Sequence, residues 1–378
     1  MNRVIYIAVL LMLVFSCKKE GPTYWSEPEP STINLVWYKS YETETKEDVE
    51  KGFLWTLSFL GAALEEPSAY RWNDDTLMVD AEKIGVADNG QEALNSLFLI
   101  IRNSEEYQAN GAFDMGRFVA LTLLSSNHYY KITGVPETLE EWMAQVPENK
   151  NLYAITESTV SVADRLISMN DSDEKGLSDQ FIAYEGFLDT TNHSFELKEY
   201  EVFDIMPNGQ LRFAIYGLDG KLKTAADEVY SLGGKPSKCI WCHEININPN
   251  FANAPDVFGF KSVESFNNQV SDWQTWLEAF KSDLNPTIDV LEKQDHTYAE
   301  LIYIGFMQPN AARLAQEWGM SESEVKTKLT SFETHDHEEF SFMQALYFRH
   351  LIDVLGPFKT IEVPIDARDA SVNEPNLL

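Results

Sequence analysis

Cysteine placement is the feature that most limits how this chain can be held together. The 378 residues include three cysteines: Cys17 follows an N-terminal apolar stretch, and Cys239 and Cys242 lie close together with His243 next to them. No thiol is left over for a structural disulfide that closes a long loop. We therefore expect the fold to depend on a large hydrophobic core, which the 44% of apolar residues can supply.

The N-terminus has the pattern of an export signal. Arg3 gives a short basic start, and residues 4–15 are apolar apart from one tyrosine hydroxyl. This run suits a signal sequence and is too short to span a bilayer comfortably. Residues 14–17, Val-Phe-Ser-Cys, resemble the lipobox of bacterial lipoproteins, in which the cysteine is acylated. The resemblance predicts a signal peptide over 1–16 and a lipidated tether over 17–31, with the lipid on Cys17; an ordinary cleaved signal and an uncleaved anchor are the alternatives.

The charge of the chain limits its classes of partner. The formal net charge is −31, and the acidic residues are spread along the sequence. Such a surface repels nucleic acid and anionic headgroups, and it favours a cationic partner or plain solubility. Residues 311–331 resemble a DNA-binding helix-turn-helix, but the second helix has no net positive face, so we interpret it as a helical corner with a capping box at Ser321 and Glu324. We expect a lipid-anchored protein of the cell envelope, on the outer membrane or the periplasmic face of the inner membrane, without a nucleic-acid partner.

Apolar periodicity predicts an α+β fold that is mainly helical. Helical spacing dominates an N-terminal region, residues 32–150, and a C-terminal region, residues 233–378. Residues 151–232 between them are β-rich, and Pro207-Asn208-Gly209-Gln210 separates two alternating runs, which is a strong hairpin signal. The expected helices cover 46–64, 91–104, 115–124, 136–143, 272–280, 298–306, 311–318, 322–329 and 338–355.

The sequence Cys239-Ile240-Trp241-Cys242-His243 carries the most specific chemistry of the chain. The pattern C-x-x-C-H is the sequence of covalent c-type haem attachment. Two thiols add to the two vinyl groups on one edge of the porphyrin, and the adjacent imidazole binds the iron. This attachment takes place outside the cytoplasm, in agreement with the export signal. We therefore predict one covalent haem c, held by Cys239, Cys242 and His243.

Other chemistries keep the cysteines but need a different setting. A thioredoxin-like redox pair lies at a strand–helix junction early in a βαβ domain, and no βαβ pattern precedes Cys239. A zinc site would need two more ligands at finger-like spacing, and no further cysteine is available. A plain disulfide turn remains as the structural alternative.

Residues downstream of the motif are similar to class I cytochromes c. Pro255-Asp256-Val257-Phe258-Gly259 lies twelve residues after His243, like the Pro-x-apolar-x-Gly loop of that family. The resemblance implies that the Pro255 carbonyl accepts a hydrogen bond from the proximal imidazole. It also implies Met307 as the sixth iron ligand. The similarity covers roughly residues 233–310. The lysine-crosslinked haem cytochromes also place a β-rich segment before C-x-x-C-H, so a haem fold other than that of class I cytochromes c is an alternative.

The sixth ligand and the function have alternatives. His128, His296 and His350 could replace Met307, or the site could be open. Residues 335–339, His-Asp-His-Glu-Glu, could hold a separate metal or be a solvated helix start. The first hypothesis for function is single-electron transfer with a redox partner protein in the periplasm. The others are an open-site haem enzyme or sensor acting on peroxide or a small gas, and a binding or assembly lipoprotein with a structural haem.

Overall fold

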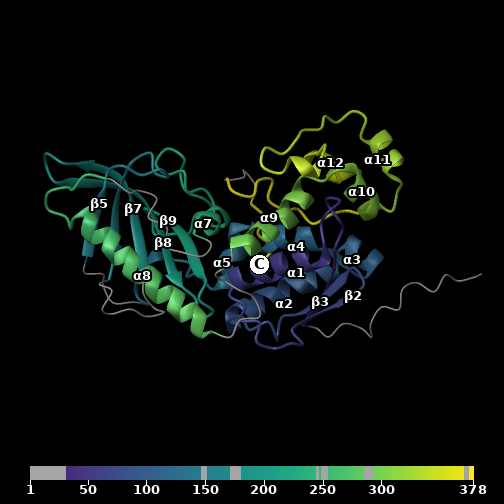
Figure 1. The fold of residues 1–378 in the computed structure, drawn as a ribbon, viewed down its shortest axis with the longest axis horizontal. Helices are drawn as coiled ribbons and strands as arrows, with labels where there is room; N and C mark the ends of the chain where they lie inside the picture. The colour runs from purple at the N-terminus through teal and green to yellow at the C-terminus, as the bar shows by residue number, and fades with distance from the viewer. Residues whose placement is uncertain are drawn as a thin grey trace, which may run out of the picture.

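The computed structural model describes residues 31–145, 151–170, 180–243, 247, 254–284, 293–369 and 374–378. In this part of the chain the strands form two separate sheets, and each sheet belongs to one of two lobes that lie side by side (Figure 1). One hydrophobic cluster runs through both lobes, and a smaller one lies under the C-terminal helices. The cysteine-poor sequence thus obtains its stability from a continuous core.

The N-terminal lobe combines a small sheet with the helices that pack on it. The sheet has the order β2-β3-β1-β4, with β1 antiparallel to β3 and parallel to β4. Its strands are β1 (Thr32–Val36), β2 (Tyr70–Asn73), β3 (Thr76–Asp80) and β4 (Phe113–Asp114). Its helices are α1 (Lys46–Phe59), α2 (Asp88–Arg102), α3 (Glu105–Asn110), α4 (Met115–Thr122), α5 (Ser126–Thr133) and α6 (Leu139–Met143).

Helix α9 (Lys293–Met307) completes this lobe from a distant part of the sequence. It packs on α1 and α4 (Figure 1). A Cβ at Gly52 would collide with the backbone of Tyr298, and one at Gly116 would collide with the side chain of Phe306. These two glycines therefore let α9 approach closely, as residues without a Cβ can.

The second lobe is an antiparallel meander with one long helix across its face. The strand order is β5-β6-β7-β8-β9, and α8 (Val263–Asp283) crosses the sheet (Figure 1). The predicted hairpin is confirmed, because β8 and β9 pair with Ile205 opposite Leu211. The strands are β5 (Asn151–Ile155), β6 (Asp164–Met169), β7 (Gln180–Asp189), β8 (Ser194–Ile205) and β9 (Leu211–Gly217). The short helix α7 (Pro236–Cys242) lies between this lobe and α5.

The C-terminal elements are tied to the N-terminal lobe by buried arginines. The guanidinium groups of Arg117, Arg313 and Arg349 lie 4.9, 5.6 and 4.1 Å from the ring centre of Phe306.

The predicted capping box of Ser321 and Glu324, in the same C-terminal part, is confirmed. The elements of this part are α10 (Ala311–Trp318), α11 (Glu322–Lys328), η2 (Ser341–Met343), α12 (Arg349–Ile352) and η3 (Asp353–Leu355).

The prediction of a mainly helical fold is wrong. The fold is α+β, but it is 39% helical and 21% strand and contains a large antiparallel sheet. The sheet of the N-terminal lobe was not predicted, because its strands have two to five residues and β1 is buried along nearly all of its length. Strands this short contain too few residues for alternation to be a reliable signal, although β2, Tyr70-Arg71-Trp72-Asn73, does alternate.

The helix predicted over 338–355 is also wrong. Only residues 349–352 form α-helix there, between two short 3₁₀ turns. Gln344 has φ 66°, which ends a helix, and Leu346 instead pairs with His335 and Asn310 as isolated β-bridges. Tertiary pairing thus overrides the amphipathic pattern.

Candidate functional site

Helix α7 is held at its first turn by the C-terminal tail. The Lys235 side chain is fully buried, and its Nζ lies 2.6 Å from Oε1 of Glu374. Nζ also donates to the carbonyl of Asp366 at 3.1 Å, and the Lys235 amide donates to the carbonyl of Arg368 at 2.8 Å. Pro236 begins the helix, where its missing N–H is not needed. The position of the motif thus depends on residues more than a hundred positions away.

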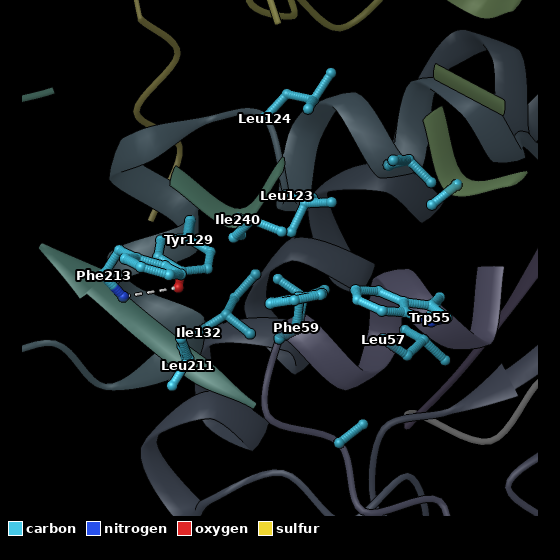
Figure 2. Packing of buried hydrophobic residues seen from close by; sticks show 14 of the residues in the cluster. Trp55, Leu57, Phe59, Leu123, Leu124, Tyr129, Ile132, Leu211, Phe213 and Ile240 are labelled. Carbon is cyan, nitrogen blue, oxygen red and sulfur yellow. Dashed lines mark hydrogen bonds between the residues drawn. The ribbon is translucent and has the colours of Figure 1, made fainter. Parts of the chain in front are cut away.

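The inner face of α7 is anchored in the main core. Figure 2 shows Ile240 packed beside Leu123 and near Tyr129, whose hydroxyl accepts a hydrogen bond from the Phe213 amide at 3.2 Å. Ile240 is 2% exposed. This anchor fixes the rotation of the helix, so Cys239, Cys242 and His243 occupy defined directions around it.

Cys239 and His243 open onto one cavity between α7, α8 and the second sheet. The cavity has a volume of about 100 Å³. The imidazole of His243 lies 5.9 and 5.8 Å from the rings of Phe203 and Phe213. On the opposite wall, α8 contributes Phe266 and Val270. The surroundings of the thiol and imidazole are therefore mostly aromatic and aliphatic.

The other end of the cavity carries buried charges. Arg165 is paired with Glu185, its neighbour across β6 and β7, and with Glu201 at 3.0 Å. Ser231 donates to Glu201. Burial raises the pKa of Glu185 well above its ordinary value, the nearby charge of Glu201 adds to this effect, and Arg165 opposes it. The cavity thus has an apolar body and one polar, ionic end.

The thiols have the wrong electrostatics for redox catalysis. Burial raises the pKa of the Cys239 thiol, and the negative charge of Glu201 raises it further. Burial also raises the pKa of Cys242. Cys242 is the last residue of α7, where the helix dipole disfavours a thiolate. The sulfurs are not joined to each other, and the preceding sheet is antiparallel, unlike the βαβ setting of a thioredoxin-like pair.

Trp241, between the two cysteines, faces a different set of residues. Its Nε1 donates to Oε2 of Glu300 at 2.9 Å. The guanidinium of Arg368 lies 4.0 Å from its ring centre, and Arg368 is paired with Glu300. This tryptophan therefore connects the motif to α9 and to the C-terminal tail.

The two residues suggested by the cytochrome resemblance lie elsewhere. Pro255 is exposed in the segment that precedes α8. Met307 is the last residue of α9, is 8% exposed, and lines a second cavity of about 970 Å³. Among the described residues, the lining of the first cavity includes Cys239 and His243 but not Met307.

Two of the alternative histidine ligands, His128 and His350, are not in the described lining of the first cavity. The side chain of the third, His296, is not among the described residues. His128 is buried, with Nδ1 2.6 Å from the carbonyl of Leu121 and Nε2 accepting from the Leu377 amide at 2.8 Å. Its ring therefore links the Leu121 carbonyl to the C-terminal segment at Leu377. His350 is exposed and lines the second cavity. His296 lies in α9 with a side chain outside the described residues, as does the predicted lipidation site Cys17.

The two histidines of residues 335–339, considered above as a separate metal site, make contacts that stabilise the fold. His335 Nε2 lies 2.7 Å from Oε1 of Gln308, and its ring stacks on Phe348. His337 accepts the amides of Glu339 and Phe340 at Nδ1. Within the described ranges, no three histidine, cysteine or acidic residues gather as metal ligands do.

Sequence reasoning missed the ionic end of the first cavity. Its signal was present: Glu185, Glu199 and Glu201 occupy positions of the same parity in two neighbouring strands, and all three face one side of the sheet. Acidic residues at inward positions of strands are unusual unless they are paired. Arg165, the partner of Glu185 and Glu201, lies two strands from Glu201, so only the sheet order reveals the cluster.

Comparisons with known proteins add no assignment. The sequence matches no protein-family model, and neither a curated protein nor a solved structure is significantly similar to it. No helix among the residues that the structure describes has the length and apolar character required to cross a membrane.

Proposed function

We propose that this chain is a c-type haem protein of the cell envelope that passes single electrons between partner proteins. The observation that carries the proposal is the setting of α7: Cys239 lies at the middle of this short helix, Cys242 is its last residue and His243 is its C-cap, and Cys239 and His243 share one mostly apolar cavity. A haem bound there supplies a one-electron iron couple.

The residues present fit covalent haem attachment. Cys239 and Cys242 are half-buried and are not joined to each other, so both sulfurs are available to form thioethers. The apolar wall of Phe203 and Phe213 suits a porphyrin edge. A cavity of about 100 Å³ is below the roughly 300–1,000 Å³ of complete ligand pockets. It therefore has room for only part of a porphyrin ring.

The surface charge and the N-terminus complete the proposal. A net charge of −31 attracts a cationic redox partner and would make the association rate fall with salt. A lipid on Cys17 would keep the protein at a membrane surface of the envelope. Both features remain predictions from the sequence.

Production of the full chain, signal included, together with a bacterial haem c maturation system tests the proposal. We expect a coloured protein whose haem stays attached after denaturation, and mass spectrometry of the matured chain should report haem and acyl groups together. Cys239→Ala and Cys242→Ala should each lose a thioether, and His243→Ala should lose the proximal ligand. His193→Ala, at an exposed histidine of the β7–β8 turn, is the matched control. A colourless wild-type protein after maturation would contradict the proposal.

A second candidate is a haem enzyme or sensor with an open iron site. It is favoured by one observation: Met307 and His350 line the second cavity, and the first cavity has neither in its described lining. Absorption spectra separate the candidates. A low-spin iron with a sulfur-to-iron charge-transfer band supports methionine ligation and electron transfer, whereas a high-spin iron that binds carbon monoxide supports an open site.

A further inference from the structure

The second cavity is large enough for a complete organic ligand. It has a volume of about 970 Å³ and lies between the end of α9, α12 and the tail over 356–368. Its size is at the upper end of the roughly 300–1,000 Å³ of small-molecule pockets. Its lining includes the apolar residues Ile304, Met307, Phe348, Val354, Val363 and Ile365.

The charges that line this cavity balance one another, although the whole chain is strongly acidic. Three basic residues, Arg349, Lys359 and Arg368, are matched by Asp353, Glu362 and Asp366. Arg349 is already paired with Glu317 and Asp353. A cavity with no charge excess favours an uncharged ligand, because an ion would leave water without compensation.

Neutral hydrogen-bonding groups are present on the same walls. His337 lines the cavity, and its Nδ1 accepts two backbone amides, so the proton of the neutral ring is on Nε2. Nε2 is therefore a donor suited to a carbonyl oxygen. The amide of Gln308 and the imidazole of His350 also line the cavity.

The cavity is connected to the haem motif by two side chains. Arg368 belongs to the cavity wall, and its guanidinium lies 4.0 Å from the ring centre of Trp241. Trp241 stands between Cys239 and Cys242 in the sequence. A redox-active ligand in this cavity would thus be one stacked pair away from the motif.

We propose that the second cavity binds a quinone-class ligand, uncharged with an apolar ring and carbonyl or hydroxyl oxygens, and that its reduced form is the electron donor. This inference rests on the proposed function. A bound hydroquinone gives up two electrons and two protons and becomes the quinone. Because the chain would carry one haem, its iron would take the two electrons in two separate steps, a partner protein would remove the first electron before the second is transferred, and the protons would leave to water.

The test uses menadione as the oxidised probe and menadiol as the reduced probe, with the full matured chain. Val354 is 86% exposed and lines the cavity, so Val354→Trp should block its mouth without disturbing the core. Val229, 65% exposed and outside the lining, provides the matched control Val229→Trp. Calorimetry should show menadione binding that Val354→Trp weakens by about tenfold or more, or 1.4 kcal/mol, while Val229→Trp leaves it unchanged.

Reduction kinetics complete the test. Menadiol should reduce the iron of the wild type and of Val229→Trp, and more slowly that of Val354→Trp, whereas dithionite should reduce all three equally. Any of three results would overturn the inference. The wild type does not bind menadione, Val354→Trp binds it as tightly as the wild type does, or menadione binds but menadiol does not reduce the haem iron. The double variant Cys239→Ala/Cys242→Ala should still bind menadione, because binding in the second cavity does not need the haem. A wild-type chain that matures without haem would contradict the proposed function, and menadione binding could still be measured on it.

Discussion

The buried pair of Lys235 and Glu374 gives the sharpest test of how the motif is positioned. The two side chains are 0% and 3% exposed, and they join the first turn of α7 to the C-terminal tail. Lys235→Met keeps most of the apolar stem but leaves the Glu374 carboxylate buried without its cation. Removal of one partner of a buried pair costs about 3–5 kcal/mol. We expect a loss of this size in the free energy of unfolding.

Urea denaturation of the matured chain measures this loss, and the haem content reports whether α7 is still presented for attachment. Glu374→Gln should be destabilising as well, and the double variant Lys235→Met/Glu374→Gln should recover part of the loss, because no charge is then left buried. Lys131→Met is the control, since Lys131 and Glu137 are 48% and 75% exposed and such pairs contribute at most about 1 kcal/mol. A loss for Lys235→Met no larger than that of the control would refute the reasoning.

Three further predictions concern the scaffold. Burial lowers the pKa of Lys281 from 10.5 to about 8, a difference equivalent to about 3 kcal/mol, so Lys281→Met should stabilise the fold by up to that amount below pH 8. This gain should vanish as the pH rises from about 8 through 10.5, which urea titrations across that range would check. Gly52→Ala should destabilise the contact of α1 with α9 by about 1–3 kcal/mol, as thermal unfolding would report. Gln344→Gly should raise stability by about 1 kcal/mol in the same assay, because φ at this position is 66°.

The helices with strong local signals were predicted well from the sequence. The helix expected over 311–318 is α10 with the same bounds, and the hairpin around Asn208 and Gly209 forms as predicted. In both cases the signal is local, with a cap or a turn residue at the boundary. The sheet of the N-terminal lobe and the breakdown of the helix predicted over 338–355 depend instead on partners that are distant in the sequence.

The candidate site also has features that the sequence predicts and features that it does not predict. The candidate residues Cys239, Cys242 and His243 could be chosen from the sequence, because they have the spacing of the C-x-x-C-H pattern. The apolar wall, the ionic end at Arg165 and the separate cavity at Met307 could not be read from it.

The sequence alone therefore determined which chemical groups are available and which short segments become helix or hairpin, because spacing and caps act over a few residues. The tertiary structure decided what surrounds those groups. The order of β6 to β8 brings Arg165 to Glu201, and the tail over 356–368 encloses the second cavity and brings Arg368 onto Trp241. Burial and charge pairing across such distances depend on how the lobes pack, and no local pattern records that packing.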